Sequence, residues 1–229
     1  MDERRRAWLA ERRASVVSDY DQGAATYDVD SYPVPVHQSF VQKLAATCPP
    51  GGIILDAPCG TGQYFPIVTG SGRHVVGIDQ SAGMLAQARA RGLATRLEQV
   101  GLQELTFTAA FDGVMTVDAM ENIPPEDWPP VLANLHRALR PHGHLYLTIE
   151  EIDEAEIDGA FAEAQVRGWP AVHGEVIEGD TAGYHYYPGR DRVMRWFADE
   201  SFMPIEEAVS DHDGWAYRHF LLRSGATPN

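Results

Sequence analysis

The stretch ILDAPCGTGQYF, residues 54–65, joins an apolar segment to a turn of small residues. Its first residues are typical of a buried β-strand that ends at Asp56, and Gly60 and Gly62 follow directly afterwards. In an open α/β sheet, ligands bind beyond the carboxyl ends of the strands, where small residues let the backbone approach them. The stretch therefore predicts a ligand site at the end of the first strand of an α/β sheet.

Four further apolar segments follow and alternate with helical segments: HVVGID (74–79), RLEQV (96–100), FDGVMTV (111–117) and HLYLTIE (144–150). Their continuous apolar runs are typical of parallel strands that helices cover on both faces, and right-handed crossovers then give a doubly wound sheet. Residues 203–211 and 215–223 predict a closing hairpin. We therefore expect a doubly wound, Rossmann-like α/β fold with a mostly parallel seven-stranded sheet, an antiparallel C-terminal strand and a small lid after the fifth strand.

The helical segments carry recognisable start and stop signals. An arginine-rich helix is predicted over residues 2–17 and a second short helix over residues 19–28. Ser81 is suited to cap a helix that follows the second strand. Pro124 and Pro125 are predicted to start the helix before the fifth strand, because proline is tolerated in a first turn.

The length of 229 residues predicts one domain. We expect its parts to be an N-terminal helical cover (1–48), a cofactor-binding core (51–150), a lid and acceptor segment (151–200) and closing strands (201–225).

Composition argues against several kinds of partner. A formal net charge of -15 does not attract a phosphate backbone, so no nucleic-acid partner is expected. No apolar run approaches the roughly 20 residues of a membrane helix, and the N-terminus lacks the apolar core of a signal peptide. We therefore expect a cytoplasmic protein without a membrane partner. The oligomeric state is left open.

The main rival for the glycine turn is a dinucleotide site. A dinucleotide fingerprint needs a third small residue after the first two glycines, whereas Gly62 is followed by Gln63, Tyr64 and Phe65. A carboxylate before the glycines also opposes a pyrophosphate and favours a ligand with an amino group. Asp79, at the end of the second strand, suits two ribose hydroxyls. The pattern favours a methionine nucleoside over a dinucleotide.

Four motifs in order resemble those of class I S-adenosylmethionine-dependent methyltransferases of the small-molecule type. They are LDAPCGTG, VVGIDQS with GMLAQAR, FDGVMTVDAMENI, and LHRALRPHGHLYLTI. The resemblance is close over about residues 15–150. It implies the methyltransferase variant of the fold, S-adenosyl-L-methionine as the cofactor, and a small-molecule acceptor.

The resemblance also implies cofactor-binding roles for matching positions. Those expected beside the methionine part are Asp56, Ala57, Gly60, Gly62, Asp118 and Ala119. Those expected beside the ribose and adenine are Asp79, Gln80, Met84, Gly101 and Leu102. Tyr20 and Tyr27 either close over the cofactor or pack helices. The chain departs from the family at Gly101, where an acidic residue is common, and at His142, where glycine is usual and a turn is expected.

The acceptor side is less clearly marked. Glu121 either orients or deprotonates the acceptor or caps the following helix, and His185 is the preferred base, ahead of His212 and His219. Tyr184 and Tyr186 would share one face of a strand. With His212 they are candidates for acceptor binding, although the lid aromatics are at least as suited to packing. These aromatic and histidine residues are Trp169, His173, Tyr184, His185, Tyr186, Tyr187 and Trp196.

No metal is expected. Asp118, Glu150 and Glu151 follow the fourth and fifth strands, but the Asp-Asn pair of magnesium-dependent O-methyltransferases is missing. We expect methyl transfer to an oxygen or nitrogen of a small molecule, for which the aromatic lid suggests a natural product. The alternatives are non-methylating chemistry on the same fold, such as a cyclase or decarboxylase, a module that senses the cofactor, and a dehydrogenase.

Overall fold

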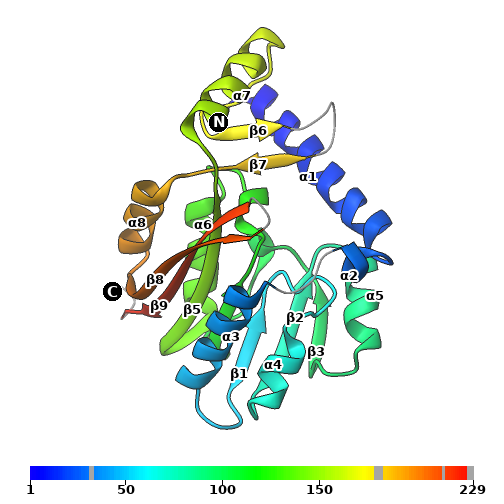
Figure 1. The fold of residues 1–229 in the computed structure, drawn as a ribbon, viewed down its shortest axis with the longest axis vertical. Coiled ribbons are helices and arrows are strands. Elements are labelled where there is room, and N and C mark those ends of the chain that lie inside the picture. Colours follow the sequence, from blue (N-terminus) through cyan, green and yellow to red (C-terminus); the bar gives the residue numbers. More distant parts are fainter. Residues whose placement is uncertain (31–33, 178–182, 213–214, 226–229) are drawn as a thin grey trace.

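The computed structural model describes residues 1–30, 34–177, 183–212 and 215–225. Its centre is a seven-stranded sheet in the order β3-β2-β1-β4-β5-β9-β8 (Figure 1). β9 runs antiparallel to β5 and β8, and the other pairs in the sheet are parallel. The expected Rossmann-like sheet is thereby confirmed. Its strands are β1 Ile53–Asp56, β2 His74–Asp79, β3 Arg96–Gln99, β4 Phe111–Thr116, β5 Leu139–Glu151, β8 Phe202–His212 and β9 Trp215–Ser224.

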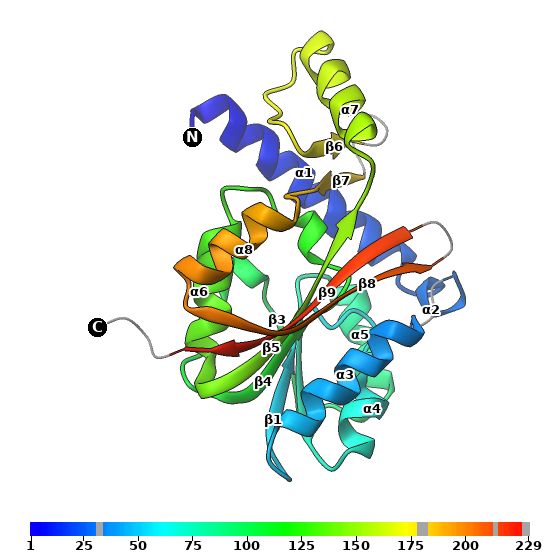
Figure 2. The ribbon, with the colours of Figure 1, turned by 60° about the vertical axis from the view of Figure 1, so that its left-hand side comes forward.

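The strands of the sheet alternate their side chains between two apolar cores. On β1, Ile54 belongs to one core and Leu55 to the other, and on β4 Met115 and Val114 divide in the same way. Three helices cover the core that contains Ile54 and Met115, and two helices cover the core that contains Leu55 and Val114 (Figure 2). These are α3 Pro35–Thr47, α4 Phe65–Gly70 and α5 Ala82–Ala90 on one face, and α6 Trp128–Ala138 and α8 Arg190–Asp199 on the other.

The strand order reverses at β1, which lies between β2 and β4. Chain connections leave β1 and β4 in opposite directions across the sheet, so a crevice opens between the segments that follow these strands. This crevice is where ligands bind in doubly wound folds. The order of the sheet thus positions the site before any side chain is considered.

A cap lies over the carboxyl ends of the parallel strands (Figure 1). It consists of the N-terminal helix and the segment between β5 and α8. Arg5 joins these parts, because its guanidinium donates to both oxygens of Glu175 at 2.8 and 2.9 Å and also pairs with Glu126. The elements of the cap are α1 Glu3–Gly23, α2 Tyr27–Asp30, α7 Glu154–Val166, β6 Glu175–Ile177 and β7 Tyr184–Tyr186.

Two predicted helix boundaries are wrong. α1 does not end near residue 17 but continues to Gly23, since no glycine or proline interrupts it earlier, and the next helix begins only at Tyr27. α6 begins at Trp128 rather than at Pro124 or Pro125, because residues 125–127 form a turn in which the N–H of Asp127 donates to the carbonyl of Pro124 at 2.9 Å. The predicted cap at Ser81 is confirmed, since Ser81 Oγ accepts a hydrogen bond from the N–H of Met84 at 3.0 Å.

His142 lies in an irregular part of β5 instead of a separate turn. The register of the β4–β5 pairing shifts next to it, and its φ of +64° is left-handed. A residue with a Cβ atom is strained in this conformation, whereas glycine adopts it at little cost. Within the described residues, no helix combines the length and apolar character needed to cross a membrane.

Candidate functional site

A cavity of about 350 Å³ lies in the crevice at the reversal of strand order. The glycine turn after β1, the ends of β2 and β4, and the inner side of α1 form its walls. Ten of the residues predicted to bind the cofactor line it: Tyr20, Tyr27, Gly60, Asp79, Gln80, Met84, Gly101, Leu102, Asp118 and Ala119. The structure therefore brings together residues from segments far apart in the sequence.

Asp79 and Gly60 form the floor of this cavity. The N–H of Gly60 donates to Asp79 Oδ2 at 2.9 Å, and the N–H of Ser81 donates to Asp79 Oδ1 at 2.8 Å. Each carboxylate oxygen retains a further lone pair for a ligand. Burial raises the pKa of Asp79, and the backbone N–H groups oppose that rise. Gly60 has a φ of +51°, and a Cβ atom there would point into open space.

Three predicted cofactor contacts do not line the cavity. Asp56 is 1% exposed and Ala57 is also buried. Gly62 is required for another reason: a Cβ atom there would lie 2.5 Å from the ring of Phe65. Phe65 begins α4 and fills the space between this helix and β2. The sequence pattern located the turn but did not separate ligand contacts from packing contacts.

Asp56 is an unusual buried acid. Its Oδ2 has no hydrogen-bond partner among the described residues. Burial raises the pKa of Asp56 well above its ordinary range, and the nearby charge of Asp79 adds to this rise. The proton is therefore bound more tightly in the folded chain than in the unfolded chain.

The segment after β3 is held rigidly at the cavity edge. The side-chain amide of Asn134, on α6, donates to the carbonyl groups of Leu102 and Gln103, both at 3.0 Å. Gly101 precedes the short 3₁₀ turn Leu102–Glu104. The backbone at Gly101 and Leu102 is thus positioned by a helix on one face of the sheet.

The N-terminal cover is clasped to the core by two aspartates that the sequence analysis did not single out. Asp21 Oδ1 accepts hydrogen bonds from Ser81 Oγ at 2.6 Å and from the N–H of Gly83 at 2.8 Å. Asp28 Oδ1 accepts from Thr61 Oγ1 at 2.5 Å, and its other oxygen pairs with Arg91. Asp21 thus ties α1 to the start of α5, and Asp28 ties α2 to the glycine turn.

Tyr20 of α1 and Tyr27 of α2 belong to this cover, and their ring centroids are 6.2 Å apart. Both line the cavity. Their position agrees with the covering role considered from the sequence, while their mutual contact is a packing contact.

The opposite wall contains residues that sequence reasoning missed. His37, Tyr64 and Tyr217 come from α3, the glycine turn and β9. His37 Nδ1 lies 3.2 Å from Tyr64 Oη, and the His37 and Tyr217 rings are 4.8 Å apart. Tyr64 lies within residues 54–65, so the sequence could have identified it as a cavity residue. The positions of the other two in the cavity depend on how α3 and β9 meet in the fold.

Three carboxyl groups gather at the ends of β4 and β5. Asp118, Glu121 and Glu150, which we term the carboxylate cluster, offer oxygens that lie within 4.8 Å of one another. Asp118 lines the cavity, whereas Glu121 and Glu150 are buried behind it. The three residues suit a bound cation or a shared proton, because adjacent carboxylates do not all ionise freely.

Glu121 occupies the 3₁₀ turn Met120–Asn122. Its Oε1 accepts from Asn122 Nδ2 at 2.9 Å, and its Oε2 has no partner among the described residues although the side chain is only 4% exposed. Burial raises the pKa of Glu121, and Asp118 and Glu150 raise it further. Burial also raises the pKa of Asp118, which a hydrogen bond with Tyr217 opposes.

β7 directs its side chains in two directions. His185 points toward the carboxylate cluster: its Nδ1 lies 3.1 Å from Tyr187 Oη and 3.7 Å from Glu150 Oε2. Tyr187 in turn donates to Glu150 at 3.3 Å. His185 and Asn122 both line a smaller cavity beside the first.

Tyr184 and Tyr186 share the other face, as the alternation predicts, but neither lines a described cavity. Tyr184 donates to Glu175 at 2.6 Å, and Tyr186 contacts Arg192. Both side chains are buried within the cap. The expectation that they bind the acceptor is not supported by this placement.

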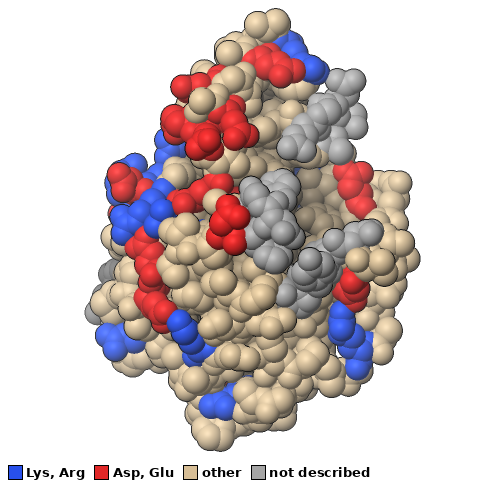
Figure 3. Space-filling model, viewed as in Figure 1, with Lys and Arg blue, Asp and Glu red and all other residues tan. Residues whose placement is uncertain are grey.

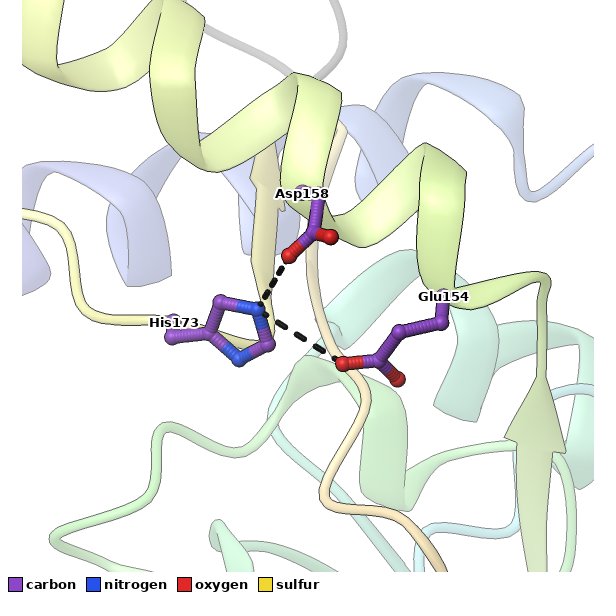
Figure 4. A group of neighbouring side chains, drawn as sticks. All are labelled: Glu154, Asp158 and His173. Atoms are coloured by element: carbon purple, nitrogen blue, oxygen red, sulfur yellow. Dashed lines mark hydrogen bonds and ion pairs between the residues drawn. The ribbon is translucent and has the colours of Figure 1, made fainter.

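The remaining histidines lie elsewhere. His219 is buried between Tyr146 and Ser210, burial lowers its pKa to about 4, and it lines neither described cavity. His173 is exposed and contacts Asp158 at 3.0 Å and Glu154 at 3.8 Å on the outer side of α7 (Figure 4). The side chain of His212 falls outside the described residues.

Comparison with known proteins agrees with this geometry. Residues 54–143 match a family model described as a methyltransferase domain. Trans-aconitate 2-methyltransferase of Deinococcus radiodurans is 30% identical over 205 residues, which cover 73% of this chain and 75% of that enzyme. Three further curated methyltransferases are matched over 60%, 50% and 55% of their own lengths.

Solved structures show the same fold. An S-adenosylmethionine-dependent methyltransferase of Methanosarcina mazei superimposes with a TM-score of 0.70 at 15% identity, covering 85% of this chain and 99% of that one. Magnesium protoporphyrin IX methyltransferase of Synechocystis, with bound S-adenosylhomocysteine, gives a TM-score of 0.65 at 18% identity, with coverages of 91% and 94%.

Proposed function

Because the chain belongs to the class I S-adenosylmethionine-dependent methyltransferases, and S-adenosylmethionine is therefore its cofactor, we propose that it methylates an oxygen or nitrogen atom of a small molecule. One observation carries the proposal: the cavity beside Gly60 and Asp79 continues to a carboxyl group, Asp118, at the end of β4. The nucleoside would bind beside Asp79, and the acceptor would bind next to it, near Asp118.

The residues present fit the cofactor. Asp79 has lone pairs for ribose hydroxyls, and Gly60 leaves open the space that a Cβ atom would fill. Asp118 and Ala119 are proposed to hold the methionine part. The residues proposed to lie beside the adenine are Gln80, Met84, Gly101 and Leu102. When bound, S-adenosylmethionine supplies a methyl group that is already activated on a sulfonium.

The protein then contributes alignment and exclusion of water. Oriented reactants can gain up to about 7–11 kcal/mol relative to free encounter. Asp21 and Asp28 hold the cover over the cavity, and Tyr20 and Tyr27 are the cover residues that line the cavity. The cover therefore separates the reacting groups from bulk water once the ligands have entered.

We propose Glu121 and His185 as the groups that accept a proton from the acceptor. Glu121 has an oxygen without a partner among the described residues, and burial raises its pKa well above the ordinary carboxyl range, which makes its carboxylate a stronger base. His185 lies beside Glu150 and Tyr187, at the wall of the smaller cavity. Each position is close to the ends of β4 and β5, where an acceptor would enter.

The acceptor named for the Deinococcus relative, trans-aconitate, is an acid. No lysine or arginine is among the described residues that line either cavity here. An acidic acceptor would meet Asp118 without a compensating cation, so we do not transfer that substrate to this chain.

The proposal is tested by calorimetry and by label transfer. S-Adenosylhomocysteine should bind, whereas NAD should not, and methyl-labelled S-adenosylmethionine should pass its label to one or more members of a small-molecule library. Binding without any label transfer would favour a sensing or non-methylating role, and binding of NAD in preference would contradict the proposal.

A further inference from the structure

We infer that the acceptor is a cationic amine, which the carboxylate cluster binds as its ammonium form and which is methylated on nitrogen. The inference rests on the proposed methyl transfer and names the acceptor class of the same site. It depends on the position and charge of Asp118, Glu121 and Glu150, and on the burial of Glu121 and Glu150.

The carboxylate cluster is built from separate elements that meet at the cavity. Asp118 follows β4 and adopts a left-handed φ of +53°, with its N–H donating to Thr148 Oγ1 at 2.7 Å. Glu121 follows on a 3₁₀ turn, and Glu150 comes from the end of β5. Their oxygens lie within 4.8 Å of one another, so a cation at Asp118 would also be close to the other two.

The described walls of the two cavities bring no fixed positive charge to the carboxylate cluster. Lysine and arginine are absent from the described residues that line the two cavities. The neighbours of Glu150 include a histidine and a tyrosine, His185 and Tyr187. Glu121 and Glu150 are buried, and carboxylates that are buried together are costly unless a proton or a cation compensates them. A positively charged acceptor supplies that compensation.

An independent observation points to a missing donor. Glu121 Oε2 is buried and has no hydrogen-bond partner among the described residues, even though buried polar atoms in folded proteins are nearly always paired. A primary ammonium carries three N–H donors and a full charge, whereas a hydroxyl group carries one donor and no charge. The amine therefore satisfies the carboxylate cluster better than an alcohol does.

Aromatic residues surround the same place. Tyr20 and Tyr217 line the cavity. Burial raises the pKa of both tyrosines, and the nearby carboxylates of Glu121 and Asp118 raise it further. Aromatic faces attract organic cations as well as contacting apolar substituents. Tyrosine and carboxylate side chains together thus form the surroundings that recognise an alkylammonium group.

The chemical step is balanced without an additional reactant. The bound ammonium first passes one proton to the carboxylate cluster, which leaves a neutral amine with a lone pair. The nitrogen forms a bond to the methyl carbon as the carbon–sulfur bond breaks, and that bond's electron pair stays on sulfur. The product is a methylated ammonium and a neutral thioether.

Calorimetry on the S-adenosylhomocysteine complex tests the inference. The probes are primary amines, alcohols and carboxylates of matched skeletons, namely the benzyl, phenethyl and butyl series, with Mg²⁺ alone as a further probe. We expect an amine to bind at least about tenfold more tightly than its matched alcohol and carboxylate.

Variants identify the residues responsible. Glu121→Gln and Glu150→Gln should each reduce this preference about tenfold while leaving the affinity for S-adenosylhomocysteine unchanged. Glu163→Gln, on the exposed side of α7, is the matched control and should change neither. Thermal unfolding of each variant verifies that it is folded.

The inference is overturned if an alcohol or carboxylate binds best, if no amine binds, or if Mg²⁺ binds and Glu121→Gln abolishes that binding. These results are distinguishable from failure of the proposed function. If S-adenosylhomocysteine binds and a neutral acceptor receives label, methyl transfer stands and only the amine is rejected. If the cofactor product does not bind at all, both fail.

Discussion

The backbone N–H of Gly60 donates a hydrogen bond to Asp79 Oδ2 across 2.9 Å. This contact joins the turn after β1 to the end of β2, two segments whose spacing would otherwise vary with the turn. The carboxylate is therefore fixed before a ligand arrives, and little ordering remains to be done on binding. A preorganised floor of this kind is the basis of the first two predictions.

Replacing Asp79 with alanine should weaken S-adenosylhomocysteine binding by about 2–4 kcal/mol, roughly 30- to 1000-fold, because two charge-assisted hydrogen bonds to the ribose are lost. Calorimetry measures this change. Asp199→Ala, at the exposed end of α8, serves as the control and should bind normally. Equal affinity for the Asp79→Ala protein and the wild type would remove this residue from the site.

The two glycines of the turn should respond differently to alanine. At Gly62 the new Cβ would meet the ring of Phe65 at 2.5 Å, so Gly62→Ala should lower the free energy of unfolding by about 2 kcal/mol or more. At Gly60 the new Cβ projects into open space, so Gly60→Ala should cost only about 1 kcal/mol but should weaken cofactor binding. Urea unfolding and calorimetry separate these effects. The reverse pattern would contradict the roles assigned to the two positions.

The clasp at Asp28 should control how long the cofactor product stays bound. Asp28→Ala removes the acceptor for Thr61 and Gln63 and the partner of Arg91, which loosens the cover. We expect dissociation of S-adenosylhomocysteine to accelerate about three- to tenfold with a smaller change in association. Stopped-flow displacement measures both rates. Glu11→Ala, on an exposed part of α1, should leave them as they are.

Asp56 should make the protein less stable as the pH rises. Its folded pKa is raised above the ordinary value of 3.8, so the folded state binds the proton more tightly than the unfolded state. The stabilisation is fully present below pH 3.8 and is lost as the pH rises toward the folded pKa. Asp56→Asn should remove this loss.

The measurement is urea unfolding of the wild type and Asp56→Asn at a series of pH values between about 5 and 8. The difference in unfolding free energy should shift in favour of the variant as the pH increases. A difference that is constant with pH would show that Asp56 does not carry the proton.

Sequence reasoning succeeded where the signal was local. The glycine turn, Asp79 and the cap at Ser81 are defined by residues a few positions apart, and their placement at strand ends follows from where the apolar segments end. The strand alternation also predicted that Tyr184 and Tyr186 share a face. The alternation did not predict which face of β7 points toward the site, because that depends on how the cap packs against the rest of the fold.

The rest required the tertiary structure. His37 and Tyr217 converge on the cavity from α3 and β9, and Asp28 reaches the turn through its side chain. No periodicity links such positions. Gly62 was assigned to the cofactor because the motif suggested it, whereas the Phe65 ring explains it. Acidic side chains also gather on the cap near α7, which a charge count alone does not locate (Figure 3).

The most direct test of the central claim is a crystal structure of the protein with S-adenosylhomocysteine. The account predicts the nucleoside in the cavity, with the ribose on Asp79 and the amino acid part beside Gly60 and Asp118. A ligand bound elsewhere, or a cavity that remains unfilled at saturating ligand, would contradict it.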